Sequence, residues 1–151
     1  MVVYLNNKTM MKNYKLPSEV SIMGCELYAI NQALIFIKND VTNMQNHSFV
    51  IYSDSLSGIM SIRNRDPNSQ RHLIYDFHQL ILDLSISYII KIKLIPGHQN
   101  IEGNKLADLA ADAAHSNHSI EECLISKPDK VRTTEVAILA KILGWDGRSY
   151  R

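Results

Sequence analysis

The sequence has few cysteines, the residues that could cross-link the chain by disulfides. Its only two cysteines, Cys25 and Cys123, lie far apart and show neither CxxC nor Cys/His spacing. This pattern argues against a disulfide framework and against a zinc site. It is typical of a protein from a reducing compartment.

The sequence also lacks an excess of one charge and a long apolar run. Lys and Arg number 16 against 15 Asp and Glu, a net charge of +1, so contacts with nucleic acid would have to come from local patches. The longest apolar stretch, residues 88–95, is interrupted by Lys91 and Lys93, and no basic region followed by an apolar one opens the chain. We therefore expect no membrane partner and an intracellular location, in the cytoplasm or the nucleus.

The chain is long and apolar enough to fold as one domain. Hydrophobic residues make up 46% of its 151 residues, which is sufficient for a buried core. We expect this domain to span residues 1–115. Residues 116–151 are expected to form a linker and a helical extension, because an apolar helical pattern over residues 133–143 ends at Gly144.

Alternating strand-like and helical patterns predict an α/β fold. Two strand-like runs, residues 2–5 and 11–16, flank Asn6 and Asn7, which tolerate a left-handed turn, so we expect a hairpin. Apolar spacing then predicts, in chain order, helix 21–38, strand 49–53, helix 55–65, helix 73–84, strand 90–94 and helix 106–113. This order favours a mixed sheet flanked by helices, with a parallel pair and the antiparallel hairpin. The alternation of residues 90–94 gives the last strand a basic face.

Three carboxylates fall on patterned elements. Glu26 lies on the helix face of Ile30 and Ile37, where a charge is costly unless it is paired or bound to a metal. The alternative is a boundary Glu that extends to solvent or pairs with a Lys. Asp54 ends an apolar strand, where α/β sheets place their ligands, although it could simply cap the next helix.

Asp108 and His98 belong to one strand-loop-helix segment. Asp108 is expected near the first turn of its helix, where an acid could also merely complement the helix dipole. His98 precedes that helix in a Gly/Pro loop, where it is either a mobile proton-transfer group or a solvated turn residue. Together, the three carboxylates are the hard oxygen ligands that Mg²⁺ prefers, so metal-assisted phosphodiester chemistry is the first hypothesis.

Three blocks of the sequence resemble the ribonuclease H family, in particular the domains carried by non-LTR retrotransposon polyproteins. CELYAI at residues 25–30 is similar to the family's AELYAI helix, and IYSDSLS at residues 51–57 is similar to its strand end (F/Y)(T/S)DSLS. IPGHQNIEGNKLAD at residues 95–108 is similar to VPGHxxIxGNExAD. The blocks occur in the family's order, and the resemblance covers about residues 1–115.

The resemblance implies a five-stranded mixed sheet flanked by helices and a nuclease that cleaves the RNA strand of an RNA–DNA hybrid. The cofactor would be Mg²⁺ in a two-metal site, with Mn²⁺ as a substitute, and the metal ligands would be Glu26, Asp54 and Asp108. The hybrid would be recognised by groove width and 2′-hydroxyls. Other domains of a retroelement polyprotein would be further partners.

The resemblance also assigns residues around the metal site. His98 would assist proton transfer or product departure, and Ser55 and Asn104 would touch the substrate. For Asn104, a role as the N-cap of the following helix is an equally good interpretation.

One part of the family pattern has no counterpart here. The family's first strand, normally central in the sheet, carries its first catalytic Asp, whereas the first Asp of this chain is Asp40, and residues 1–4 look like the family's second strand. The resemblance therefore predicts a sheet without its central strand, in a truncated or degenerate copy with impaired catalysis. The alternatives are a non-catalytic nucleic-acid-binding or scaffold module of retroelement origin and a translated relic without function.

Overall fold

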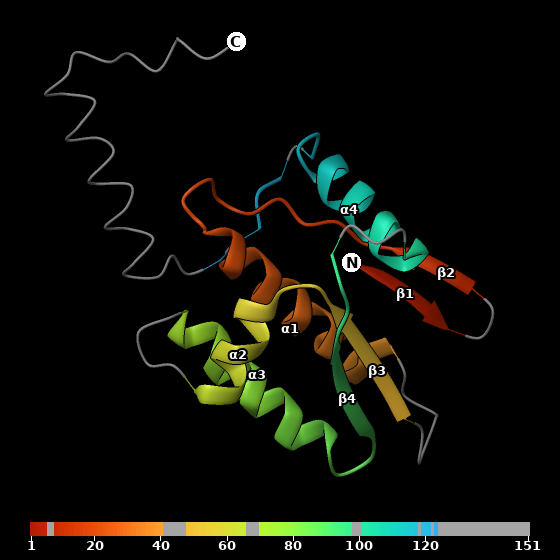
Figure 1. Cartoon of the computed structure of the whole chain (residues 1–151), viewed down its shortest axis with the longest axis vertical. Coiled ribbons are helices and arrows are strands. Elements are labelled where there is room, and N and C mark those ends of the chain that lie inside the picture. Colours follow the sequence, from red (N-terminus) through yellow and green to blue (C-terminus); the bar gives the residue numbers. More distant parts are fainter. Residues whose placement is uncertain are drawn as a thin grey trace, which may run out of the picture.

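The computed structural model describes residues 1–5, 8–40, 48–65, 70–97, 101–117, 119–121 and 123. The chain alternates strands and helices (Figure 1). In order, the elements are β1 (Val2–Leu5), β2 (Lys8–Met11), α1 (Ile22–Asp40), β3 (Ser48–Ser53), α2 (Leu56–Asn64), α3 (Arg71–Leu84), β4 (Ile89–Leu94) and α4 (Glu102–Ala114). The predicted α/β class is confirmed.

The hairpin is shorter than the sequence pattern predicted. Val2 pairs with Met11 and Leu5 with Lys8, so only two residues connect the strands, a length that suits tandem Asn. The prediction of a second strand over residues 11–16 was wrong, because residues 12–17 belong to no strand. The short connection fixes the register of the hairpin. Lys12 exchanges backbone hydrogen bonds with Met1, the first residue, so the residues after Lys12 have no partner in β1.

The strands form two separate pairs. β1 and β2 are antiparallel, whereas β3 and β4 are parallel, from Ser48 beside Ile89 to Ser53 beside Leu94. Within the described residues, no ladder of hydrogen bonds joins the two pairs. In Figure 1 the hairpin lies next to α4, and β3–β4 form a pair of their own. The predicted parallel pairing is confirmed, and the divided sheet is consistent with the absence of a central strand.

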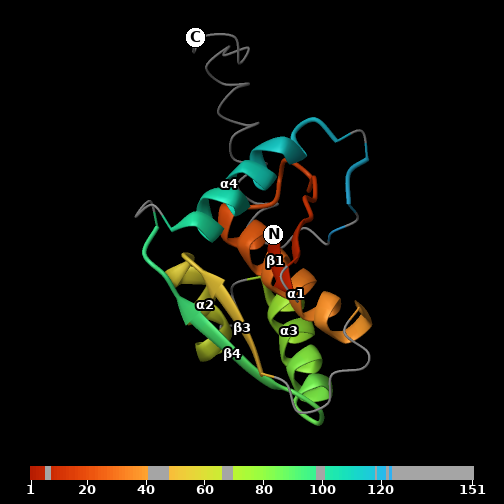
Figure 2. The same ribbon diagram turned by 90° about the vertical axis from the view of Figure 1, so that its right-hand side faces the viewer.

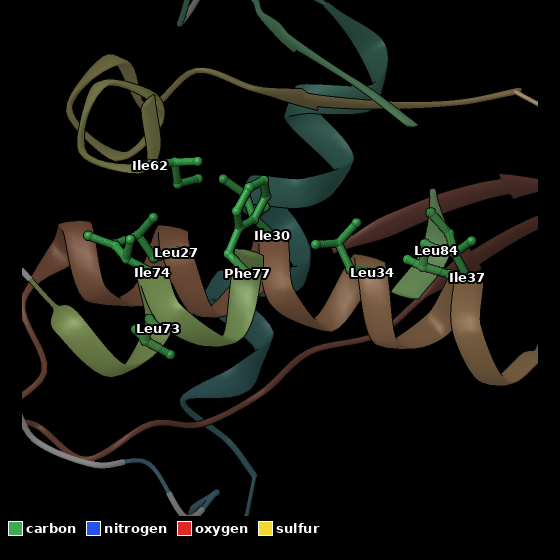
Figure 3. Close-up of a cluster of buried hydrophobic side chains, with 9 residues drawn as sticks. All are labelled: Leu27, Ile30, Leu34, Ile37, Ile62, Leu73, Ile74, Phe77 and Leu84. Atoms are coloured by element: carbon green, nitrogen blue, oxygen red, sulfur yellow. The ribbon is translucent and has the colours of Figure 1, made fainter. Parts of the chain in front are cut away.

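The core lies between α1, α3 and one face of β3–β4. Figure 2 shows the strand pair on one side and the two helices on the other. The buried side chains come from α1, α2 and α3 (Figure 3): Leu27, Ile30, Leu34, Ile37, Ile62, Leu73, Ile74, Phe77 and Leu84. Phe49 and Ile51 of β3 and Ile90 and Ile92 of β4 pack against them. Period-two alternation thus puts one face of the strand pair into the core and turns the other toward solvent.

Residues that follow α4 return to the start of the chain. The Lys15 ammonium donates to the carbonyls of His115 and Asn117, and the backbone N–H of Glu121 donates to the carbonyl of Lys15 at 2.7 Å. Burial, with smaller contributions from the charges of Glu121 and Cys123, raises the pKa of Tyr28 to about 12.

The predicted helical extension over residues 133–143 lies outside the described residues. Among the helices that are described, none is both long and apolar enough to cross a membrane.

Candidate active site

Asp54 is held at the corner between β3 and α2 by its two serine neighbours. The buried Ser53 hydroxyl accepts a hydrogen bond from the backbone N–H of Ser55 at 3.1 Å. The Ser55 hydroxyl then caps α2 by accepting from the N–H of Gly58 at 3.2 Å. Ser55 is therefore the N-cap, and the capping alternative for Asp54 was wrong. The Asp54 carboxylate remains available for other partners.

The Asp54 carboxylate is tied to α4. The side-chain amide of Asn104 donates to Asp54 Oδ2 at 3.1 Å, across 50 residues of sequence. The N-cap of α4 is Ile101, so the capping interpretation of Asn104 was wrong. Asn104 lies inside the first turn of α4, and its side chain serves to join that helix to the end of β3.

Asp108 lies one turn beyond Asn104 on α4. Residues four apart share one face of a helix, so Asp108 follows Asn104 along the face that reaches the Asp54 corner. The expectation that Asp108 is a first-turn acid was wrong, because α4 begins at Glu102 and Glu102 is its first-turn acid. The helix begins earlier than its apolar pattern, whose first large residue is Leu106. A role for Asp108 in complementing the helix dipole is thereby removed.

Glu26 brings α1 into the same neighbourhood. Its side chain is half-buried, and burial, followed by the negative charges of Asp54 and then Asp108, raises the pKa of Glu26. The ammonium group of Met1 acts in the opposite direction and more weakly. Among the described residues, no Lys or Arg forms an ion pair with Glu26. Three elements distant in sequence thus supply carboxylates whose charges act on one another.

The chemistry of these three carboxylates fits a hard divalent cation, but their arrangement does not form a closed metal site. Within the described part of the chain, no group of three His, Cys, Asp or Glu side chains is close enough to hold one ion. Charges interact over much longer distances than the metal–oxygen contacts of about 2.0–2.6 Å that Mg²⁺ and Ca²⁺ require. The carboxylates are near one another, yet they are not assembled around a single point.

Two further contacts at the site were not predicted from the sequence. A Cβ atom at Gly97 would lie 3.3 Å from Asp54 Oδ2, so the backbone after β4 closely approaches the carboxylate. The Pro96-Gly97 dipeptide is a turn signal, but a turn signal does not show which side chain the turn approaches. Tyr4 of β1 would meet a Cβ at Gly103 at 3.6 Å, which places the hairpin against the start of α4. His98 lies outside the described residues.

A groove on the described surface lies away from these carboxylates. A groove of about 330 Å³ between α1 and α3 is lined by residues that include Tyr28, Asn31, Leu80 and Asp83. None of the three carboxylates borders it. The candidate site is instead the corner formed by β3, α1 and α4.

Comparison with known proteins supplies the identity of this arrangement. The family model for RNase H matches residues 1–116, which includes every described strand and helix. No curated protein and no solved structure gave a significant match. Because the matched region spans about three quarters of the sequence and contains all three carboxylates, the chain belongs to the RNase H family.

Proposed function

We propose that this chain is an RNA–DNA hybrid nuclease domain of the non-LTR retrotransposon type, and that its catalysis is impaired. Membership of the RNase H family supports a ribonuclease that acts on hybrids. The observation that carries the proposal is the gathering of Glu26, Asp54 and Asp108 at one corner. There Asn104 donates to Asp54 at 3.1 Å, and burial, followed by the charges of Asp54 and Asp108, raises the pKa of Glu26. Three converging carboxylates of this kind favour a positively charged ligand in their midst.

In the proposed site, Glu26, Asp54 and Asp108 hold Mg²⁺, with Mn²⁺ as a substitute. When bound, such ions would supply the activation of a water molecule and the stabilisation of the leaving oxygen. Asn104 orients the Asp54 carboxylate, as its hydrogen bond of 3.1 Å indicates. His98 moves a proton or assists product departure, and Ser55 contacts the substrate beside its capping role. The domain occupies residues 1–115, and residues 116–151 connect it to other parts of a retroelement polyprotein.

The proposed impairment has a structural basis in the divided sheet. β1 and β3 each pair with only one described strand. We propose that the strand that would lie between them, with its carboxylate, is not supplied by residues 1–151. With one ligand fewer, the divalent ion binds weakly and is poorly positioned.

The proposal is tested by restoring the strand. The chain alone is expected to cleave a labelled RNA–DNA hybrid in Mg²⁺ very slowly or not at all. The same chain, extended ahead of Met1 by a strand of the family type that bears an Asp, should cleave it. Asp54→Asn in the extended chain should abolish the cleavage, because Asn keeps the shape of Asp and removes the charge.

A matched control is the same extension with Asn in place of its Asp. This control restores the strand but not the metal-binding carboxylate. This control should fold as well as the active form and remain inactive. Rapid cleavage by the unextended chain would contradict the proposed impairment. In that case Asp112, one turn beyond Asp108, would be the first residue to replace.

A second function, a non-catalytic nucleic-acid-binding or scaffold module, is favoured by one observation. The described residues contain no group of three ligands that could hold a metal ion. If the extended chain folds, as judged by circular dichroism and a cooperative melt, and still does not cleave, the binding module becomes the better explanation.

A further inference from the structure

The solvent face of β3–β4 has a composition that the carboxylate site does not explain. The register places Val50 beside Lys91 and Tyr52 beside Lys93, and all four side chains are exposed. The face is completed by Ser48 and Ile89, so it contains two cations and no carboxylate. Because the whole chain carries a net charge of only +1, this is a local concentration of positive charge.

The aromatic ring on this face is accessible to a ligand. Tyr52 is 58% exposed in the next-to-last cross-strand pair of β3–β4, whereas its neighbours Ile51 and Ser53 point inward. Among the described residues, neither Lys91 nor Lys93 forms an ion pair. A flat ring flanked by lysines is suited to a polyanion that also presents rings for stacking.

The face leads directly to the carboxylates. The backbone N–H of Ile95 donates to the carbonyl of Ser53 at 2.9 Å, so β4 accompanies β3 up to the Asp54 corner. Tyr52 precedes Asp54 by two residues, a separation of less than about 7 Å along an extended strand. Lys93, its cross-strand partner, lies at the same level. A ligand on this face therefore extends naturally to the candidate active site.

We propose that Lys91, Lys93 and Tyr52 bind the phosphodiester backbone of the nucleic-acid substrate and guide it toward Asp54. The inference rests on the proposed function, for which it names a substrate-binding surface. The lysines neutralise successive phosphates, and the Tyr52 ring supports a base or sugar of an unpaired or frayed strand. The surface contributes affinity without sequence preference, because phosphates are common to every sequence and stacking on a ring tolerates any base.

The test measures binding in EDTA, where no divalent ion bridges the substrate and no cleavage takes place. Fluorescence anisotropy is recorded with the full chain and three labelled probes: an RNA–DNA hybrid, a DNA duplex and a single-stranded RNA. The double variant Lys91→Glu/Lys93→Glu is expected to bind the duplex probes about tenfold or more weakly. The dependence of log K on log salt should flatten by about 0.9 for each lysine contact that is lost.

Matched controls separate this role from general charge and from folding. Arg71→Glu makes the same change of charge per residue at the exposed start of α3, a helix that packs on the opposite face of the strand pair, and should leave affinity and salt slope unchanged. Lys91→Arg/Lys93→Arg should retain binding. Tyr52→Ala should lower the affinity for the single-stranded probe about fivefold or more. Tyr52→Phe keeps the ring and should bind this probe with the affinity of the unaltered chain.

The proposal is overturned if Lys91→Glu/Lys93→Glu binds with the affinity and salt slope of Arg71→Glu, or if the unaltered chain binds none of the three probes. The relative affinities for hybrid, duplex and single strand identify which nucleic acid the surface prefers. Cleavage by the strand-extended chain remains the separate test of the nuclease function. Restored cleavage together with unaffected binding by the double glutamate variant would remove this surface and leave the nuclease function standing.

Discussion

Single residues at the carboxylate corner have clear energetic roles. Glu26 is the residue at which burial and like charges combine, whereas Asn104 offsets part of the repulsion by donating to Asp54. One side chain thus makes the corner costly, and the other holds it together.

Replacement of Glu26 by Gln is expected to stabilise the folded chain at neutral pH in EDTA. The folded-state pKa of Glu26 is raised above 4.5, so the protonated form favours folding. The stabilisation provided by protonation is fully present below pH 4.5 and is lost as the pH rises through the raised pKa. The melting temperature of Glu26→Gln should therefore exceed that of the unaltered chain at neutral pH, and the two should converge in acid.

The control is Glu102→Gln, which replaces an exposed acid in the first turn of α4. This replacement should not raise the melting temperature. Equal melting temperatures of Glu26→Gln and the unaltered chain across the pH range would show that Glu26 carries no cost in the folded state.

The hydrogen bond between Asn104 and Asp54 can be measured by a double-mutant cycle. Asn104→Ala is expected to destabilise the chain, whereas Asp54→Ala loses the same hydrogen bond but also relieves the repulsion of Glu26. The coupling free energy between the two replacements should be about 1 kcal/mol. Urea denaturation of the two single variants and the double variant gives this value. Additive effects would mean that the contact contributes nothing in solution.

At the scale of elements, α1 and α3 are joined by a buried polar contact as well as by apolar packing. The Asn31 side chain is 5% exposed and donates to the carbonyl of Leu73 at 2.9 Å. The contact fixes the two helices against each other beneath β3–β4. Because Glu26 belongs to α1, the Asn31 contact also fixes the position of one carboxylate.

Asn31→Ala is expected to lower the free energy of unfolding by about 1–3 kcal/mol, through the lost hydrogen bond and the space left behind. Asn39→Ala makes the same replacement at an exposed position of the same helix. It should change the free energy of unfolding by less than about 0.5 kcal/mol. Chemical denaturation of the two variants side by side is the measurement. Equal stabilities would show that the Asn31 contact is not formed in solution.

At the scale of the whole molecule, repeating patterns predicted the fold better than they predicted turns and contacts. The apolar period of α3 and the alternation in β4 were predicted to within two residues, because burial imposes these periods on the sequence. The start of α4 was missed, since Glu102, Gly103 and Asn104 carry no apolar signal. The second hairpin strand was misplaced because alternation alone does not set the register.

The candidate site was accessible from the sequence only in part. The motifs indicated Glu26, Asp54 and Asp108, but the serine that caps α2 and the amide that contacts Asp54 depend on three-dimensional positions. Sequence spacing also could not show that Gly97 approaches Asp54. Short polar contacts have no period, and only the folded chain reveals them.

The division of the strands into two pairs has a consequence for the behaviour of the chain in concentrated solution. Among the described residues, β1 and β3 each leave one row of backbone N–H and C=O groups without a neighbouring strand. Such rows are templates for edge-to-edge aggregation between copies, and the lysines of β4 do not lie on the β3 row. Colloidal stability, rather than the melting temperature, then sets the highest concentration at which the chain can be handled.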